Sequence, residues 1–194
     1  MNEQECAAWE LHAFLTRRNV SYVIIGGLAV QRWGEPRFTQ DVDVTAVFPL
    51  DDPVPLLQEL TAHFPARLPD AVDFARRNRV LLVRASNGVS LDISLGLPGY
   101  EEEVMARAVD WELEPGKVVR LCAAEDLIIH KAVAGRPQDL RDIEGIIYRQ
   151  GPTLDPATIR RWLEAFAEVL AQPDLPERFE TPWRKMLKFR SQST

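Results

Sequence analysis

The chain has 194 residues, a formal net charge of −6 at pH 7, 46% hydrophobic residues and 27% charged residues. These values are typical of one globular domain with room for a helical appendix, and the acidic balance excludes a surface that is basic throughout. Two cysteines cannot build a disulfide framework, and the first residues are polar, unlike those of a signal peptide. No apolar run reaches the ~20 residues of a membrane span. We therefore expect a cytoplasmic protein with no membrane partner.

The chain begins with an expected helix and a short strand. Apolar residues at helical spacing predict an amphipathic helix over Gln4–Arg18, and an apolar run predicts a buried strand over Tyr22–Ile25. Gly26 and Gly27 end this strand and open a helical turn. Taken alone, a Gly-Gly pair indicates only a turn, but between a strand and a helix its N–H groups can approach phosphate oxygens.

An aspartate-rich strand follows. The alternation Asp41-Val42-Asp43-Val44-Thr45 has the period of a strand, which places Asp41, Asp43 and Thr45 on one face. Two carboxylates about 7 Å apart along one strand face repel each other unless water or a cation lies between them. Hard oxygen ligands at this spacing suit Mg²⁺ that holds a phosphate.

A second carboxylate-bearing strand is expected further along. After a helix over Pro55–Phe64 and an ambiguous stretch, two β-rich runs, Val80–Arg84 and Val89–Leu95, are separated by the hairpin signal Ser86-Asn87-Gly88. Asp92 lies in the middle of the second run, where a charge without a partner is costly. The alternative is an ordinary exposed face of an antiparallel sheet.

The remaining elements are mostly helical. We expect a helix over Tyr100–Arg107 and a hairpin of Trp111–Glu114 with Lys117–Leu121. The next helix ends at Gly135, and another begins at Pro137. A helix from Asp155 to Leu170 follows, and Thr181-Pro182 starts a last helix over Trp183–Phe189. The last segment also carries a run of basic residues, which is either a solvated tail or a surface for an RNA acceptor.

The order Gly26-Gly27, Arg37-x-Thr39, Asp41-x-Asp43 resembles the DNA polymerase β-like nucleotidyltransferase superfamily, and most closely its small bacterial members related to the AbiEii and MenA-type toxins. The resemblance covers about Ser21 to Tyr148. It implies an α/β (α+β) fold, with a small mixed, mainly antiparallel sheet, flanking helices and additional C-terminal helices. Residues 1–150 would form the catalytic domain and residues 151–194 a helical extension packed on it.

The resemblance also implies site residues. Asp41, Asp43 and Asp92 would be the catalytic metal ligands for two Mg²⁺ ions, with Mn²⁺ as an alternative, and Asp92 would also activate the acceptor hydroxyl. The nucleotide-binding residues would be Gly26, Gly27, Arg37, Thr39, Lys131 and Arg136.

A second resemblance lies in the segment from Glu125 to Asp142. Lys131 would neutralise the triphosphate, and Asp139 and Asp142, three residues apart on one helical face, would orient Lys131 or Arg136. The alternative is a set of surface ion pairs that contribute little to stability.

The implied reaction moves a nucleoside monophosphate from an NTP to an acceptor hydroxyl of RNA, such as tRNA, or of protein. The chain would then be one half of a toxin–antitoxin pair, with an antitoxin protein as its partner. Two alternatives stay open: an NTP-binding or partner-binding module without turnover, and a nucleotidyltransferase that modifies a small molecule of the antibiotic kind.

Overall fold

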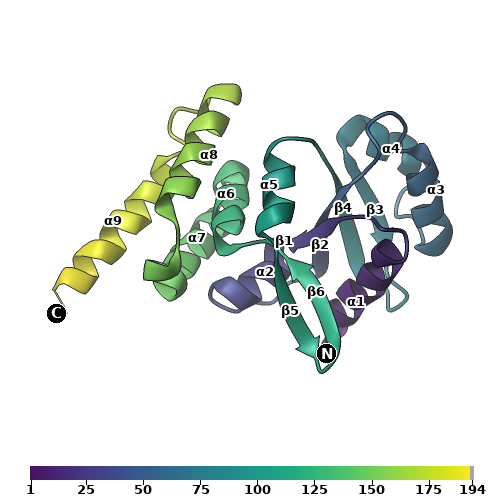
Figure 1. The fold of residues 1–194 in the computed structure, drawn as a ribbon, viewed down its shortest axis with the longest axis horizontal. Helices are drawn as coiled ribbons and strands as arrows, with labels where there is room; N and C mark the ends of the chain where they lie inside the picture. The colour runs from purple at the N-terminus through teal and green to yellow at the C-terminus, as the bar shows by residue number, and fades with distance from the viewer. Residues whose placement is uncertain (193–194) are drawn as a thin grey trace. The chain divides into compact units, whose positions relative to one another are not determined.

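The structure, a computed structural model, describes residues 1–192 and has the expected α/β class with a six-stranded mixed sheet (Figure 1). The strands are β1 (Tyr22–Ile25), β2 (Asp41–Val47), β3 (Val80–Arg84), β4 (Ser90–Gly96), β5 (Val109–Glu114) and β6 (Lys117–Leu121). The helices are α1 (Glu3–Thr16), α2 (Gly26–Trp33), α3 (Val54–His63), α4 (Ala71–Asn78), α5 (Tyr100–Arg107), α6 (Ala124–Ala134), α7 (Pro137–Gln150), α8 (Pro156–Val169) and α9 (Glu177–Ser191), with a short 3₁₀ turn η1 (Gly151–Thr153) after α7.

The chain divides into two compact units. Unit 1 comprises residues 1–28 and 38–122, and unit 2 comprises residues 29–37 together with residues from 123 onward. Helices α6 and α7 therefore group with α8 and α9, which differs from the boundary expected after residue 150. The expected division into a catalytic domain, residues 1–150, and a helical extension, residues 151–194, is a statement about function, and it stays a prediction.

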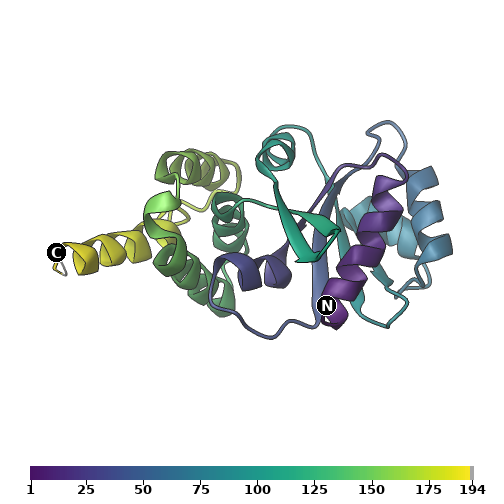
Figure 2. The ribbon, with the colours of Figure 1, turned by 60° about the horizontal axis from the view of Figure 1, so that its bottom comes forward.

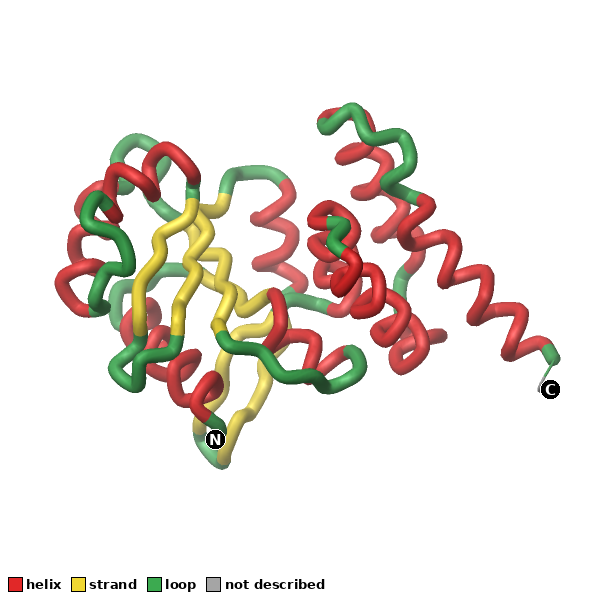
Figure 3. The backbone as a smooth tube through the Cα atoms, turned by 180° about the vertical axis from the view of Figure 1, so that it is seen from behind, coloured by secondary structure: helices red, strands yellow, loops and turns green. Residues whose placement is uncertain are grey.

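Unit 1 contains the whole sheet, in the order β3-β4-β2-β1-β6-β5 (strands yellow in Figure 3). Three neighbouring pairs are antiparallel, and two, β2 with β4 and β1 with β6, are parallel. The predicted hairpins are present as β3–β4 and β5–β6. The sheet is therefore mixed and mainly antiparallel, as expected.

One face of the sheet is the core of unit 1. Because side chains alternate along a strand, Val42 and Val44 of β2 lie on the same face as Leu91 and Ile93 of β4, and all four are fully or almost fully buried. Helices α1, α3 and α4 lie next to one another (Figure 2), and the ring of Phe14 in α1 is 5.3 Å from that of Phe64 after α3. The opposite face of β2 and β4 carries the aspartates.

Local signals explain several boundaries in unit 1. The Asn2 side chain accepts a hydrogen bond from the Glu5 N–H, and the Glu5 carboxylate accepts one from the Asn2 N–H, which caps the start of α1. The stretch before β3, ambiguous in sequence, forms α4. Arg79 ends α4 in the left-handed conformation, and its guanidinium donates to the carbonyl oxygens of Leu95 and Gly96.

Unit 2 is helical, and its last helix differs from the sequence-based expectation. We expected Thr181-Pro182 to start that helix, but α9 begins at Glu177 and contains Pro182 in its interior. The reason is the apolar stripe of α9: Phe179, Trp183 and Met186 are buried, and the Phe179 and Trp183 rings stack with centroids 5.4 Å apart. This burial outweighs the hydrogen bond that a proline lacks inside a helix.

The first residues of unit 2 pack against α7. The Arg149 guanidinium donates to the Gly34 carbonyl, and the Gln150 amide donates to the Trp33 carbonyl. A Cβ on Gly34 would lie 3.0 Å from the Ile146 side chain, so a glycine suits this close approach. Across residues 1–192, no helix has the length and apolar character that crossing a bilayer requires.

Candidate active site

The site in unit 1 is built on the strand register between β2 and β4. Asp43 is directly opposite Asp92, and Asp41 is opposite Ser90. Since opposed residues share a face, and residues two apart on one strand share a face, the three aspartates lie on the same face of the sheet. Neighbouring strands are about 4.8 Å apart, so two carboxylates at opposed positions repel each other unless a cation lies close to them.

Gly26 adjoins the Asp43 carboxylate directly. A Cβ atom built on Gly26 would overlap the side chain of Asp43, and Gly26 has a positive φ of 64°. Ile25, the residue before it, is paired with Asp43 across β1 and β2. The first glycine of the pair is therefore required both for its backbone conformation and for the space in which the Asp43 carboxylate lies.

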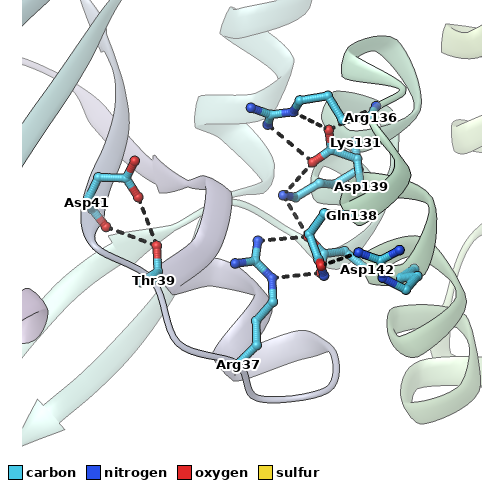
Figure 4. Close-up of polar contacts among 9 residues, drawn as sticks. Arg37, Thr39, Asp41, Lys131, Arg136, Gln138, Asp139 and Asp142 are labelled. Carbon is cyan, nitrogen blue, oxygen red and sulfur yellow. Dashed lines mark hydrogen bonds and ion pairs between the residues drawn. The ribbon is translucent and has the colours of Figure 1, made fainter.

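Gly27 and Thr39 have a similar relationship. A Cβ on Gly27 would overlap the Thr39 hydroxyl. That hydroxyl is buried and donates a hydrogen bond of 2.9 Å to Oδ1 of Asp41 (Figure 4). Thr39 therefore holds the orientation of the Asp41 carboxylate, and the missing side chain at Gly27 leaves the space for it.

Asp92 has a partner that the sequence did not reveal. The guanidinium of Arg67 forms an ion pair with the Asp92 carboxylate. Arg67 lies in the segment between α3 and α4, which carries no motif and matches no expected element. No local signal could have identified it, because its position depends on how this segment pairs with β3.

The donor chemistry of this face suits a hard divalent cation. Asp41, Asp43 and Asp92 offer carboxylate oxygens, the ligand type that Mg²⁺ prefers. Within residues 1–192, however, no three side chains of His, Cys, Asp or Glu are grouped closely enough to hold a metal ion. The three aspartates share a face but are not gathered around one point, so a metal would have to draw them together. Their assignment as metal ligands stays a prediction.

The other predicted residues form a charged cluster in unit 2, composed of Arg37, Lys131, Arg136, Asp139 and Asp142 (Figure 4). Lys131 Nζ lies 2.9 Å from Oδ1 of Asp139 and 2.8 Å from Oδ2 of Asp142. The exposed fractions of these three side chains are 6%, 1% and 3%. Lys131 on α6 is thus a buried ammonium held by two buried carboxylates on α7.

Two arginines complete the charged cluster. Arg37 donates to both carboxylate oxygens of Asp142, from Nε and from Nη2, at 2.9 Å each. Arg136 donates from its backbone N–H and its Nε to Oδ2 of Asp139. The Arg136 side chain is 74% exposed and that of Arg37 is 30% exposed, so the arginines form the accessible part of the cluster.

The two carboxylates of this cluster are held by its three cations, Arg37, Lys131 and Arg136. Burial alone would raise the pKa of Asp139, but the hydrogen bonds and charges of Arg136 and Lys131 outweigh it and lower that pKa below its usual value. The pKa of Asp142 is lowered in the same way by Arg37 and Lys131.

The eleven predicted site residues thus fall into two sets. Unit 1 brings together Gly26, Gly27, Thr39, Asp41, Asp43 and Asp92, and unit 2 brings together Arg37, Lys131, Arg136, Asp139 and Asp142. Within the second set, each aspartate contacts Lys131 and one arginine. The sequence did not reveal Arg67 or Gln138, whose amide donates to Asp142 at 2.9 Å.

Comparisons with known proteins give the family of the chain and a structure of similar fold. A protein-family model with the description "Nucleotidyl transferase AbiEii toxin, Type IV TA system" matches residues 18–192. No curated protein sequence matches the chain significantly. Among solved structures, an antigenic nucleotidyltransferase-like protein from Paracoccidioides brasiliensis is similar in fold, with 19% identity, 92% of each chain covered and a TM-score of 0.55. The antibiotic-resistance factor ANT(2″)-Ia is 17% identical over 98% of this chain and 92% of its own, with a TM-score of 0.46, which is too low to support an argument.

Proposed function

Because the chain belongs to the AbiEii nucleotidyltransferase family and is therefore a nucleotidyltransferase, we propose that it transfers a nucleoside monophosphate from an NTP to an acceptor hydroxyl in a Mg²⁺-dependent reaction. The observation that carries the proposal is the register of β2 and β4. It places Asp43 opposite Asp92 and Asp41 two residues away on the same face. Asp41, Asp43 and Asp92 would hold the metal, which when bound supplies charge neutralisation at the triphosphate.

The side chains of unit 1 have separate tasks in this proposal. Thr39 keeps Asp41 oriented, and Gly26 leaves the Asp43 carboxylate accessible. Asp92 accepts the proton of the acceptor hydroxyl as the acceptor oxygen forms its bond to the α-phosphorus. The bond from that phosphorus to the β-phosphate oxygen breaks, and pyrophosphate leaves with the electron pair.

The charged cluster of unit 2 supplies the phosphate-binding role in the proposal. The exposed guanidinium of Arg136 suits an anionic ligand. Lys131 is buried beneath Asp139 and Asp142, so it would act mainly by keeping these carboxylates neutralised and fixed. Arg37 and Arg136 would then be the groups of this cluster that contact phosphate oxygens.

We further propose RNA, such as tRNA, or protein as the acceptor, and a toxin role with an antitoxin as partner. The description of the family as a toxin of a type IV toxin–antitoxin system supports this role. The alternative, an NTP-binding module without turnover, has one observation in its favour: Asp92 is engaged by Arg67 rather than directed to a metal. A transfer assay distinguishes the two functions.

The test incubates the full chain with labelled NTPs and Mg²⁺, with total cellular RNA, protein extract or small acceptors in separate reactions. We expect label in a macromolecular fraction, loss of at least ~10²-fold in rate for Asp43→Asn, and loss of activity on removal of Mg²⁺ with a chelator. The matched control is Asp110→Asn, which removes an exposed strand aspartate paired with Arg120. Near-normal transfer by Asp43→Asn would contradict the metal assignment, and NTP binding without transfer would favour the binding module.

A further inference from the structure

Arg67 is part of the sheet, because the short segment before α4 pairs with the outer edge of β3. Ala66 forms an antiparallel bridge with Val83, the Arg67 N–H donates to the Leu82 carbonyl at 3.0 Å, and the Arg84 N–H donates to the Pro65 carbonyl at 2.9 Å. In this register Arg67 is opposite Leu82. The backbone of Arg67 is therefore fixed at a defined position in the sheet.

This position places Arg67 in one row with two of the aspartates. Leu82 is opposite Asp92, and Asp92 is opposite Asp43, so Arg67, Leu82, Asp92 and Asp43 follow one another across the sheet on the same face. Strands are spaced by about 4.8 Å, and a long arginine side chain can reach past Leu82 to Asp92. The observed ion pair is the result of this arrangement.

The ion pair is not needed to hold the fold together. The side chains of Arg67 and Asp92 are 27% and 29% exposed, and partly exposed ion pairs contribute about 1 kcal/mol or less. The effect of the Arg67 charge on metal binding by Asp92 and Asp43 is more important. The guanidinium of Arg67 occupies Oδ1 of Asp92, one of the carboxylate oxygens that a divalent cation shared with Asp43 could use.

We propose that Arg67 is the counter-ion of Asp92 in the metal-free enzyme and that a divalent cation displaces it. The ion pair then lowers the affinity of the site for metal and sets the metal concentration at which Asp92 joins Asp41 and Asp43. This inference rests on the proposed function, because it takes the three aspartates as the metal ligands.

The test measures Mn²⁺ binding directly, from the electron paramagnetic resonance signal of free Mn²⁺, with no NTP present. Arg67→Gln removes the competing charge, and we expect it to tighten Mn²⁺ binding by about 5- to 10-fold, since a cation next to the site disfavours a second one. The matched control is Arg84→Gln. Arg84 is an exposed arginine on the same face of β3, opposite Ser90, and it donates to the Gly88 carbonyl.

We expect Arg84→Gln to change the affinity for Mn²⁺ less than ~2-fold. The charge of Arg84 is screened by solvent and lies two positions along β3 from Leu82, the residue opposite Asp92. The effect of Arg67→Gln should disappear when Asp92 is also replaced by Asn, since residue 92 then offers no carboxylate to an arginine or to a metal ion. Unchanged or weaker Mn²⁺ binding by a folded Arg67→Gln would overturn the inference. If that variant does not fold, Arg67→Met decides, because it also removes the charge but keeps a long side chain: tighter Mn²⁺ binding supports the competition, and no gain overturns it.

Failure of this inference is distinct from failure of the proposed function. If the wild type transfers nucleotide but Arg67→Gln binds Mn²⁺ no more tightly, only the role of Arg67 is wrong. If Arg67→Gln binds Mn²⁺ more tightly but the wild type transfers nothing under any condition, the competition stands and the transferase proposal is overturned. Absence of Mn²⁺ binding in both forms overturns this inference and the metal assignment together.

Discussion

Gly26 has no side chain at the one place where a Cβ atom would overlap the carboxylate of Asp43. The same residue has a φ of 64°, a conformation that residues with a side chain adopt at a cost of about 1–2 kcal/mol. Residue 26 is thus a glycine for two reasons, its positive φ and the space that the Asp43 carboxylate occupies. The two reasons can be separated experimentally, because another glycine of the chain has a positive φ but no neighbouring side chain.

We predict that Gly26→Ala lowers transfer by at least ~10²-fold, because the new methyl group displaces Asp43 from its position. The control is Gly88→Ala. Gly88 also has a positive φ, 84°, but nothing lies within 4 Å of the Cβ that would be added. Both variants should lose stability by about 1–2 kcal/mol in urea unfolding, and only the first should lose activity. Equal activity of the two variants would show that the contact with Asp43 is unimportant.

Lys131 is the central cation of the unit 2 cluster, and its removal leaves Asp139 and Asp142 buried with one arginine each. We predict that Lys131→Met destabilises the protein by about 3 kcal/mol, as measured by urea unfolding. Lys188→Met, which removes an exposed lysine near the end of α9, should change stability by less than about 0.5 kcal/mol.

A double variant tests the physical cause. Lys131→Met combined with Asp139→Asn removes one charge of each sign, so it should recover part of the stability lost in the single variant. Additive losses in the double variant would mean that the cluster tolerates an uncompensated carboxylate and that Lys131 acts only through its packing.

His130 on α6 makes stability dependent on pH. Its imidazole is partly buried, and the loss of solvation there lowers the pKa to about 4 from the usual 6.5. Because the folded-state pKa lies below the unfolded one, the stabilisation is complete above pH 6.5 and is lost as the pH falls toward 4. The expected loss between pH 7 and pH 4.5 is about 2–3 kcal/mol.

Urea unfolding of the wild type and of His130→Leu at these two pH values checks this prediction. The variant should lose less stability on acidification than the wild type, whatever its stability at pH 7. His12, whose pKa is also lowered by burial, remains in both proteins and contributes equally. The lowered pKa values of Asp139 and Asp142 produce losses of the same sign, but only below about pH 3.8. Parallel pH profiles of the two proteins would contradict the assignment to His130.

The sequence by itself determined which residues share a face. The alternation in β2 and β4 placed Asp41 and Asp43 on one face and Asp92 among small polar neighbours, and the hairpins at Gly88 and Gly116 were predicted from turn residues. The order of glycines, Arg37-x-Thr39 and aspartates indicated the family, which the family comparison confirmed. These features are local, because side-chain direction follows from the period of the backbone and turn type from the residues of the turn.

Only the tertiary structure decided which segments are neighbours. The parallel pairing of β2 with β4 places Asp92 opposite Asp43, and the pairing of residues 65–67 with β3 brings Arg67 to Asp92. The start of α9 at Glu177 likewise follows from the burial of its apolar stripe rather than from Pro182. Pairing between distant strands and burial between helices depend on the whole set of surfaces that must be covered, and no local pattern in the chain specifies that set.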